Sequence, residues 1–286
     1  MDSLVLGASG NLGRALCLHL LDRQEKVAGT YLSFEPLLDD VQLVQADVSS
    51  DQLFDFVMRF KPAKVYHLAW STNLDECESN PDLAYGPARI GLDSLLRACS
   101  ETGSHLIFMS SDGIFGDPEC ERYEDSPPCP INQYGIGKVE AEDKIKGSGI
   151  DWTILRACPV GYNISRERGL VNWILKSFKE GKTITGYADS SFTPLSVTTL
   201  ARELSIIGSG DMKQTLHFLS DPPITKYDFL VETARILRVS DKRITKGSLE
   251  EADFVAPRPK RQDLQTRDAA RRTFAIDREI QLSLGI

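Results

Sequence analysis

The chain has 286 residues, a formal charge of −8 and charged residues at 26% of its positions. This length allows one large core or two coupled domains, and the composition is ordinary for a globular protein. The negative charge argues against general binding to nucleic acid or to an anionic membrane, and no apolar run approaches a membrane span. Residues 1–10 lack the pattern of a secretory leader, so we expect a cytoplasmic protein.

Short apolar strands alternate with segments of helical period through the first half of the chain. Strands are expected at 3–9, 26–32, 41–48, 64–70, 105–111 and 151–157. Helices are expected at 11–24, 50–62, 80–103 and 131–145, and the third of them ends on a glycine. This alternation is typical of a Rossmann-type α/β fold, in which helices cover both faces of a doubly wound parallel sheet.

The second half of the chain is less regular. Helices are expected at 169–182, 197–208 and 225–239, and a strand at 215–220, while the last thirty residues are charged and weakly patterned. We therefore expect a Rossmann domain over 1–156 and a smaller α/β domain, mainly substrate-binding, over 157–286. Segments around 190–220 are expected to pack back on the first domain.

The cysteines give no sign of a metal site or a redox motif. None of them forms CxxC, and none has metal-ligand spacing with the four histidines. We expect reduced thiols at all six positions, as is usual in the cytosol. The six are Cys17, Cys77, Cys99, Cys120, Cys129 and Cys158.

A GxxGxxG motif lies between the first strand and the first helix. Its glycines allow a tight turn and a close backbone approach, and the helix N-terminus presents free N–H groups to a diphosphate. This context predicts a nicotinamide dinucleotide site, and a glycine-rich turn without a ligand is the alternative. The residues that line the loop are Gly7, Ser9, Gly10, Asn11, Leu12 and Gly13.

The end of the second strand leaves the choice between NADPH and NADH open. The stretch from Thr30 to Ser33 contains no acid for a ribose 2′-hydroxyl and no arginine for a 2′-phosphate. Nothing there repels the phosphate, which favours NADPH slightly, and Thr30 is a candidate cofactor contact. Asp47 and Val48 end the third strand, where they would flank the adenine, although Asp47 could equally be a helix N-cap.

Tyr134 and Lys138 would lie one turn apart on one face of a helix. A nearby cation favours an ionised phenol, and such a tyrosine can exchange a proton with a substrate oxygen. The spacing alone is also met by two ordinary surface residues. Ser111 ends the fifth strand, where parallel sheets bind ligands, so it could hydrogen-bond a carbonyl oxygen or be a turn serine. The order of the glycine loop, Ser111 and the Tyr–Lys pair predicts a catalytic trio.

Several segments, taken together, resemble the extended short-chain dehydrogenases and, among them, the dTDP-4-dehydrorhamnose reductase family. The similarity runs over nearly the whole chain. It is carried by the segments GASGNLGRAL (7–16), HLAWSTNLDECESNP (67–81), SSDGIFGD (110–117), YGIGKVEAE (134–142) and RPKRQDL (258–264).

The resemblance implies roles for individual residues. Ser111 would polarise a keto oxygen, Tyr134 would donate the proton, and Lys138 would hold the nicotinamide ribose and lower the phenol pKa. Further residues would line the cofactor cleft (Leu68, Ala69 and Trp70) or bind substrate (Thr72, Asp112 and Arg258). Arg258 would pair with a diphosphate, and a solvated charge is its alternative.

The resemblance implies a reductase that acts on a 4-keto-6-deoxy nucleotide sugar, but the chain departs from the family pattern at several substrate-side positions. Gly113, Ala88 and Ala15 stand where the family usually has tyrosine, asparagine and an acid, and a tryptophan after the sixth strand is absent. A reductase or epimerase for a non-sugar substrate is therefore an alternative.

The same segments also resemble the regulatory beta subunit of methionine adenosyltransferase, which acts by binding a partner. Assembly as a homodimer stays open.

Overall fold

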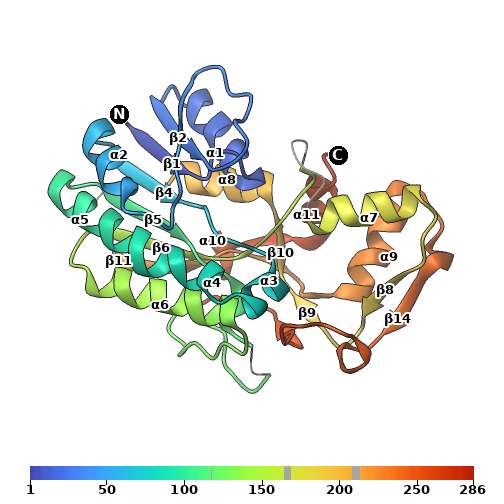
Figure 1. Ribbon diagram of the computed structural model, residues 1–286. Coiled ribbons are helices and arrows are strands. Elements are labelled where there is room, and N and C mark those ends of the chain that lie inside the picture. Colours follow the sequence, from blue (N-terminus) through green and yellow to red (C-terminus); the bar gives the residue numbers. More distant parts are fainter. Residues whose placement is uncertain (117, 164–168, 208–212) are drawn as a thin grey trace.

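In the computed structural model of this protein, a seven-stranded parallel sheet forms the centre of the larger of two lobes (Figure 1). The structure describes residues 1–116, 118–163, 169–207 and 213–286. The sheet confirms the expected α/β fold. In spatial order its strands are β11 (Lys213–His217), β6 (Trp152–Arg156), β5 (His105–Met109), β4 (Lys64–His67), β1 (Ser3–Leu6), β2 (Val27–Tyr31) and β3 (Val41–Gln45).

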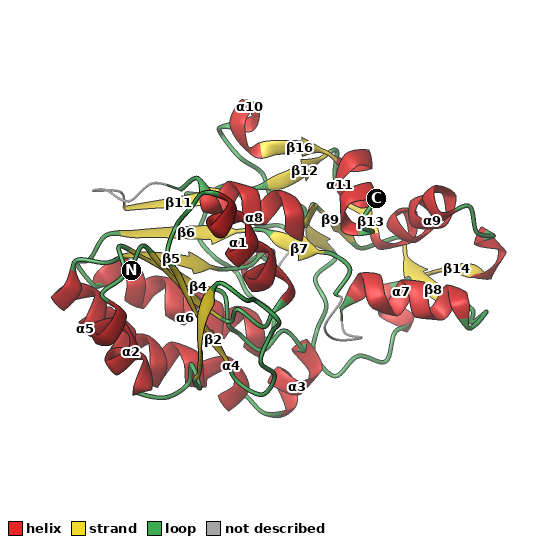
Figure 2. Ribbon diagram, turned by 90° about the horizontal axis from the view of Figure 1, so that it is seen from above, coloured by secondary structure: helices red, strands yellow, loops and turns green. Residues whose placement is uncertain are grey.

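Helices cover both faces of the sheet (Figure 2). On one face, α1 (Asn11–Asp22) packs beside α8 (Val197–Ser205), and most of their leucines are buried against the strands. On the other face, α2 (Gln52–Phe60), α5 (Leu92–Thr102) and α6 (Gln133–Gly147) bury a second apolar layer. The inner strands β1, β4, β5 and β6 are buried on both sides and are mainly apolar, whereas the edge strands β3 and β11 are partly exposed and more polar.

The direction of winding reverses between β1 and β4. Strands β2 and β3 continue the sheet on one side of β1, whereas β4, β5, β6 and β11 continue it on the other. Ligands of open parallel sheets bind in the crevice outside the carboxyl ends of the strands at such a reversal. The loops after β1, β4 and β5 meet there, and they carry most of the predicted site residues.

The long helix expected at 80–103 is interrupted. The structure has α4 (Asp82–Gly86), a π-helical turn η1 (Pro87–Gly91) and then α5, preceded by a separate α3 (Leu74–Ser79). Proline has no N–H to donate into an α-helical ladder, so Pro87 accounts for the change of hydrogen-bond pattern. The expected terminal glycine is Gly103, which closes α5 in the left-handed conformation.

The smaller lobe has its own apolar core, which includes Val171, Ile174, Phe192, Phe229 and Ile280. Most of its strands are too short to show a two-residue period, which is why few were expected. Its elements, and those that join it to the sheet, are β7 (Cys158–Val160), α7 (Leu170–Lys179), β8 (Ile184–Tyr187), β9 (Ser191–Phe192), β10 (Pro194–Ser196), β12 (Leu219–Asp221), β13 (Ile224–Thr225), α9 (Lys226–Leu237), β14 (Ile244–Gly247), β15 (Arg261–Gln262), α10 (Ala269–Arg272), β16 (Thr273–Ala275) and α11 (Ile276–Ser283). Single short turns are η2 (Asp112–Ile114), η3 (Asp241–Arg243) and η4 (Leu249–Glu251).

Later segments also contact the larger lobe. Helix α8 packs on α1, and β11 pairs with β6 at the edge of the sheet. The division into domains at residue 156 stays a prediction. The expected strand at 215–220 is split into β11 and β12, and Gly208, the last residue of the helix expected at 197–208, lies outside the described residues.

The C-terminal end and two of the cysteines differ from expectation. The weakly patterned last residues form α11, whose Ile276 and Ile280 enter the core of the smaller lobe. Cys120 and Cys129 are joined by a disulfide bond, so the expectation of reduced thiols is wrong for this pair. In the described ranges, no helix combines the length and the apolarity that crossing a membrane requires.

We predict that Gly91→Ala destabilises the protein because the new methyl has no room. A Cβ at Gly91 would lie 1.7 Å from the carbonyl oxygen of Val48, where the end of η1 packs on the loop after β3. We expect the free energy of unfolding to fall by about 2 kcal/mol or more, measured by urea denaturation. The control is Gly147→Ala in α6, where a Cβ would have no neighbour within 4 Å and stability should stay equal or rise slightly. Equal losses in both variants would contradict the packing at Gly91.

Candidate active site

The glycine loop packs closely against the end of β4. Gly7 has φ of +92°, a conformation that L side chains rarely adopt, and a Cβ there would lie 3.0 Å from the backbone nitrogen of Ala69. A Cβ at Gly13 would lie 2.1 Å from the carbonyl oxygen of Gly7. These two contacts require glycine, and they bring the first turn of α1 next to the loops after β1 and β4.

The N-terminus of α1 has no side-chain cap. Gly10 is the N-cap residue, and its own N–H donates to the carbonyl oxygen of Gly7 at 2.9 Å. The first N–H groups and the positive end of the helix dipole therefore suit a diphosphate. Ser9 and Asn11 are half-buried in this loop, whereas the side chain of Leu12 is buried in the core and would leave only its backbone for a ligand.

Other predicted cofactor residues have structural contacts of their own. Thr30 is buried, and its hydroxyl accepts a hydrogen bond from the N–H of Gly7 at 3.1 Å, so it supports the glycine loop. Asp47 is exposed and accepts from the N–H of Ser49, which makes it the cap of a turn and not of a helix. Val48 is half-buried beside α5. Their cofactor contacts stay predictions.

Ser111 and Tyr134 converge just beyond the carboxyl end of β5. Ser111 Oγ accepts from the N–H of Gly113 at 3.0 Å and donates to Asp112 Oδ1 at 2.9 Å. Tyr134 stands in the first turn of α6, whose start is fixed by Asn132, the N-cap residue that accepts from Gly135 N at 2.9 Å. Close approach of the tyrosine ring to Ser111 depends on Gly113, where a Cβ would lie 3.2 Å from Ser111 Oγ and 3.3 Å from the ring.

The environment of Tyr134 keeps its phenol protonated. Burial raises the pKa of Tyr134 above its usual value, and the hydrogen bond with Ser111 opposes this only partly. The lowering of the phenol pKa that the Tyr–Lys spacing predicts is thus not the net effect in this geometry. A protonated phenol next to a serine hydroxyl can provide two donors to one oxygen atom.

Lys138 lies one turn further along α6 and is almost fully buried. Its Nζ donates to the carbonyl oxygen of Met109 at 2.8 Å and lies 4.0 Å from the centre of the Trp70 ring. Burial lowers the pKa of Lys138 to about 7, against the opposing charge of Glu142. Burial therefore destabilises the ammonium form of Lys138, and this side chain loses its proton close to physiological pH.

A buried ion pair holds α6 against the sheet. Arg156 of β6 donates to both carboxylate oxygens of Glu142, at 2.9 and 2.6 Å, and Ser110 donates to the same carboxylate at 2.6 Å. Both charged side chains are at most 1% exposed. Arg156 and Ser110 help to lower the pKa of Glu142 to about 2 against the opposing effect of burial. Glu142 follows Lys138 by one turn, so this pair fixes the rotation of the helix that carries Tyr134.

Three residues of the site were not predicted from the sequence: His67, Cys158 and Lys226. His67 ends β4 without a hydrogen-bond partner on either ring nitrogen, and burial lowers its pKa to about 3. Lys226, from α9 of the smaller lobe, interacts electrostatically with Asp112 and Cys158, and burial lowers its pKa. A helix was expected at 225–239, but nothing in the sequence indicates that Lys226 lies near the end of β5.

The predicted substrate residues are not all together. Asp112 is buried beside Ser111, and Trp70 lies at the end of β4 with Leu68 and Ala69. Thr72 is exposed in the loop before α3. The Arg258 guanidinium is occupied by Asp75 at 2.9 Å, which ties the C-terminal segment to α3. Arg258 is therefore not the solvated charge that was the alternative prediction. Its contact with a substrate diphosphate stays a prediction.

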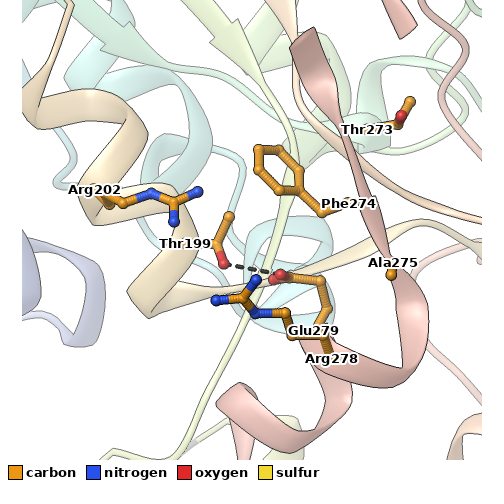
Figure 3. A pocket seen from close by; sticks show the side chains of 7 residues that line it. All are labelled: Thr199, Arg202, Thr273, Phe274, Ala275, Arg278 and Glu279. Atoms are coloured by element: carbon orange, nitrogen blue, oxygen red, sulfur yellow. Dashed lines mark hydrogen bonds between the residues drawn. The ribbon is translucent and has the colours of Figure 1, made fainter. Parts of the chain in front are cut away.

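A separate small pocket lies away from these residues (Figure 3). It measures about 240 Å³ and lies between α8, β16 and α11. Its acidic residue, Glu279, accepts from the N–H of Ser196 and from the hydroxyl of Thr199, both at 2.8 Å, and so holds the start of α8. No predicted site residue lines this pocket. Most of the predicted site residues lie instead beyond the carboxyl ends of β1, β4 and β5.

The sequence matches the family described as RmlD substrate binding domain over residues 1–285. Among solved structures, a dTDP-4-dehydrorhamnose reductase from Bacillus anthracis in complex with NADP superposes with a TM-score of 0.78 at 22% identity, covering 99% of each chain. At this identity the likeness concerns the fold.

Two relatives have names that describe different roles. A probable low-salt glycan biosynthesis reductase of Haloferax volcanii is 26% identical over 267 residues, which cover 91% of this chain and 88% of that protein. Methionine adenosyltransferase 2 subunit beta of Xenopus tropicalis is 30% identical over 161 residues, or 56% of this chain. The aligned part spans about half the length of that subunit (47%).

We predict that the buried lysine makes stability depend on pH. The pKa of Lys138 is about 7 in the folded chain and about 10.4 in an unfolded one, so between these values only the unfolded chain holds the proton. The stability of the wild type relative to Lys138→Met should therefore rise with pH from about 7 to 10, by at most about 1.4 kcal/mol per pH unit. Urea unfolding at pH 6.5, 8 and 9.5 tests this. Parallel curves for the two proteins would rule out the lowered pKa.

Proposed function

Because the chain belongs to the RmlD substrate binding domain family, we propose that it is a NAD(P)H-dependent carbonyl reductase, with a 4-keto-6-deoxy nucleotide sugar as its substrate. The observation that carries the proposal is the convergence of Ser111 and Tyr134 beyond the carboxyl end of β5. This pair lies on the same edge of the sheet as the glycine loop. A bound carbonyl and a bound nicotinamide would thus meet at one place.

The reaction needs a hydride donor at the carbonyl carbon and a proton donor at the carbonyl oxygen. A bound nicotinamide would supply the hydride. The Ser111 hydroxyl would rotate its one proton from Asp112 Oδ1 to the carbonyl oxygen, and Tyr134 would donate the proton as negative charge develops there. The Tyr134 phenol is protonated at neutral pH, so it has a proton to give when an alkoxide forms, although burial, which raises its pKa, makes it a weaker acid in the absence of ligands. Lys138 would bind the nicotinamide ribose from the next turn of α6.

The residues present fit a dinucleotide. The uncapped start of α1 suits the diphosphate, and the tight contacts of Gly7 and Gly13 leave the backbone open to it. We favour NADPH over NADH because the stretch from Thr30 to Ser33, at the end of β2, contains no acid that would repel a 2′-phosphate. The bound NADP of the Bacillus anthracis reductase supports this choice of cofactor.

The family and its relatives support the substrate class. The Haloferax volcanii relative is named as a glycan biosynthesis reductase, and the Bacillus anthracis structure as a dTDP-4-dehydrorhamnose reductase. We also propose a cytoplasmic location. The Cys120–Cys129 disulfide is the observation against that location, because disulfides are rare in the cytosol.

A regulatory subunit is the second candidate function. It is favoured by the 30% identity to methionine adenosyltransferase 2 subunit beta, although the match covers only 56% of this chain. In that case the protein would bind the dinucleotide and a partner enzyme without reducing a sugar. A reductase or epimerase for a non-sugar carbonyl is the third candidate, because Gly113, which packs against the Tyr134 ring, stands where the family pattern has a tyrosine.

We predict that Tyr134→Phe lowers kcat for dTDP-4-dehydrorhamnose by about 100-fold or more, since the phenol oxygen is the proton donor. NADPH affinity should stay within about threefold, because the ring and the glycine loop are unchanged. NADPH oxidation and NADPH fluorescence titration measure the two effects. The matched control is Tyr187→Phe, in β8 of the smaller lobe, which should keep wild-type rates.

Equal rates for Tyr134→Phe and the wild type would refute the assignment of Tyr134. If the wild type binds NADPH but does not turn over the sugar, we would infer that the protein is a regulatory subunit or acts on a non-sugar substrate. Co-purification with a synthetase-like partner distinguishes these two.

A further inference from the structure

Lys226 reaches the reaction site from the other lobe. Strand β13 pairs with β9, which places Thr225 beside Ser191 and carries the start of α9 toward the cleft. The backbone N–H of Lys226 donates to the carbonyl oxygen of Ser190 at 2.8 Å, and its Nζ lies 3.2 Å from the centre of the Phe192 ring. The ammonium is thereby directed at Asp112 and Cys158, with which it interacts electrostatically.

The Lys226 ammonium and the Asp112 carboxylate can each form further hydrogen bonds. Among the hydrogen bonds and ion pairs of the described residues, none involves Lys226 Nζ, which lies against the Phe192 ring and interacts electrostatically with Cys158 and Asp112. Asp112 is 4% exposed, and its Oδ2 has no hydrogen-bond partner, while Oδ1 accepts from Ser111. An unpartnered buried carboxylate oxygen costs free energy, so a ligand that donates to it is stabilised.

One chemical group fits both residues. A hydroxyl accepts one hydrogen bond and donates another, so it can bridge the Lys226 ammonium and Asp112 Oδ2. A carboxylate fits poorly, because Asp112 already balances the lysine charge and would repel a second anion. Ser111 Oγ lies 2.9 Å from Asp112 Oδ1, so a hydroxyl bound at Oδ2 would lie close to the carbonyl that Ser111 holds, as a hydroxyl on the adjacent carbon does.

We propose that Lys226 and Asp112 bind the hydroxyl on the carbon adjacent to the carbonyl that is reduced, and that Lys226 thereby selects substrates with this vicinal keto-hydroxyl arrangement. The inference rests on the proposed function and narrows its substrate class. For a 4-keto-6-deoxy nucleotide sugar, this hydroxyl is on C3. Because Lys226 belongs to the smaller lobe and Asp112 to the larger one, the same contact couples the two lobes through the substrate.

The test compares binding of two probes to the NADP-bound protein by calorimetry: dTDP-rhamnose and its 3-deoxy analogue. The wild type should bind the analogue about 10- to 100-fold more weakly, since a hydrogen bond to a charged group is lost. In Lys226→Met the two probes should differ by less than about threefold. Lys246→Met, which removes an exposed ammonium of β14, is the matched control and should behave as the wild type does.

Turnover is the second readout. Lys226→Met should raise KM for dTDP-4-dehydrorhamnose about 10-fold or more and change kcat by less than about threefold. If Lys226→Met does not fold, Lys226→Gln keeps a donor of similar length and should show a smaller rise in KM. An equal loss for the 3-deoxy probe in wild type and variant would overturn the role of Lys226.

The two proposals fail in different ways. A wild type that reduces the sugar while Lys226→Met keeps its KM refutes the inference alone. A wild type that distinguishes the probes through Lys226 but never oxidises NADPH refutes the reductase alone. A wild type that binds neither probe overturns both.

Discussion

The buried pair of Glu142 and Arg156 is the interaction on which the rest of the site depends. Removing either partner would leave an uncompensated charge in the core, at a cost of about 3–5 kcal/mol, so the pair acts as a unit. It locks α6 to β6, while Gly135 and Gly137 allow the first turns of the helix to approach the carbonyl oxygens of Gly113 and Ala84. With the helix held at these places, Tyr134 and Lys138 have little freedom to turn away from the end of β5.

The two lobes contribute different chemistry to the crevice between them. The larger lobe provides the glycine loop and the Ser111–Tyr134 donors, which suit a dinucleotide and a carbonyl oxygen. The smaller lobe provides the Lys226 ammonium, directed at Asp112. The C-terminal segment crosses back to the larger lobe, where Arg258 pairs with Asp75, and Asp75 also accepts from the N–H of Ala256 at 2.9 Å. The residues that we propose for substrate recognition are therefore far apart in the chain.

Local features of the structure could be predicted from the sequence, whereas long-range features could not. The glycine loop and the strand–helix alternation are local patterns, and the fold inferred from them is confirmed. The interruption at Pro87 is local as well, but one proline in an apolar helical pattern does not show whether the helix bends or ends. Lys226, His67 and the Asp75–Arg258 pair depend on tertiary contacts, for which residue spacing carries no signal. The raised phenol pKa likewise follows from burial, which the Tyr–Lys spacing cannot show.

The central claim is that the crevice transfers a hydride to a carbonyl carbon. Its most direct test is isotopic: the protein is incubated with dTDP-4-dehydrorhamnose and NADPH deuterated at C4 of the nicotinamide, separately for each face of the ring, and the sugar product is examined by NMR. We expect deuterium on C4 of the sugar from one face only, together with a proton from solvent on the new hydroxyl. Oxidised cofactor without deuterium in the sugar, or an unchanged sugar beside bound cofactor, would contradict the account.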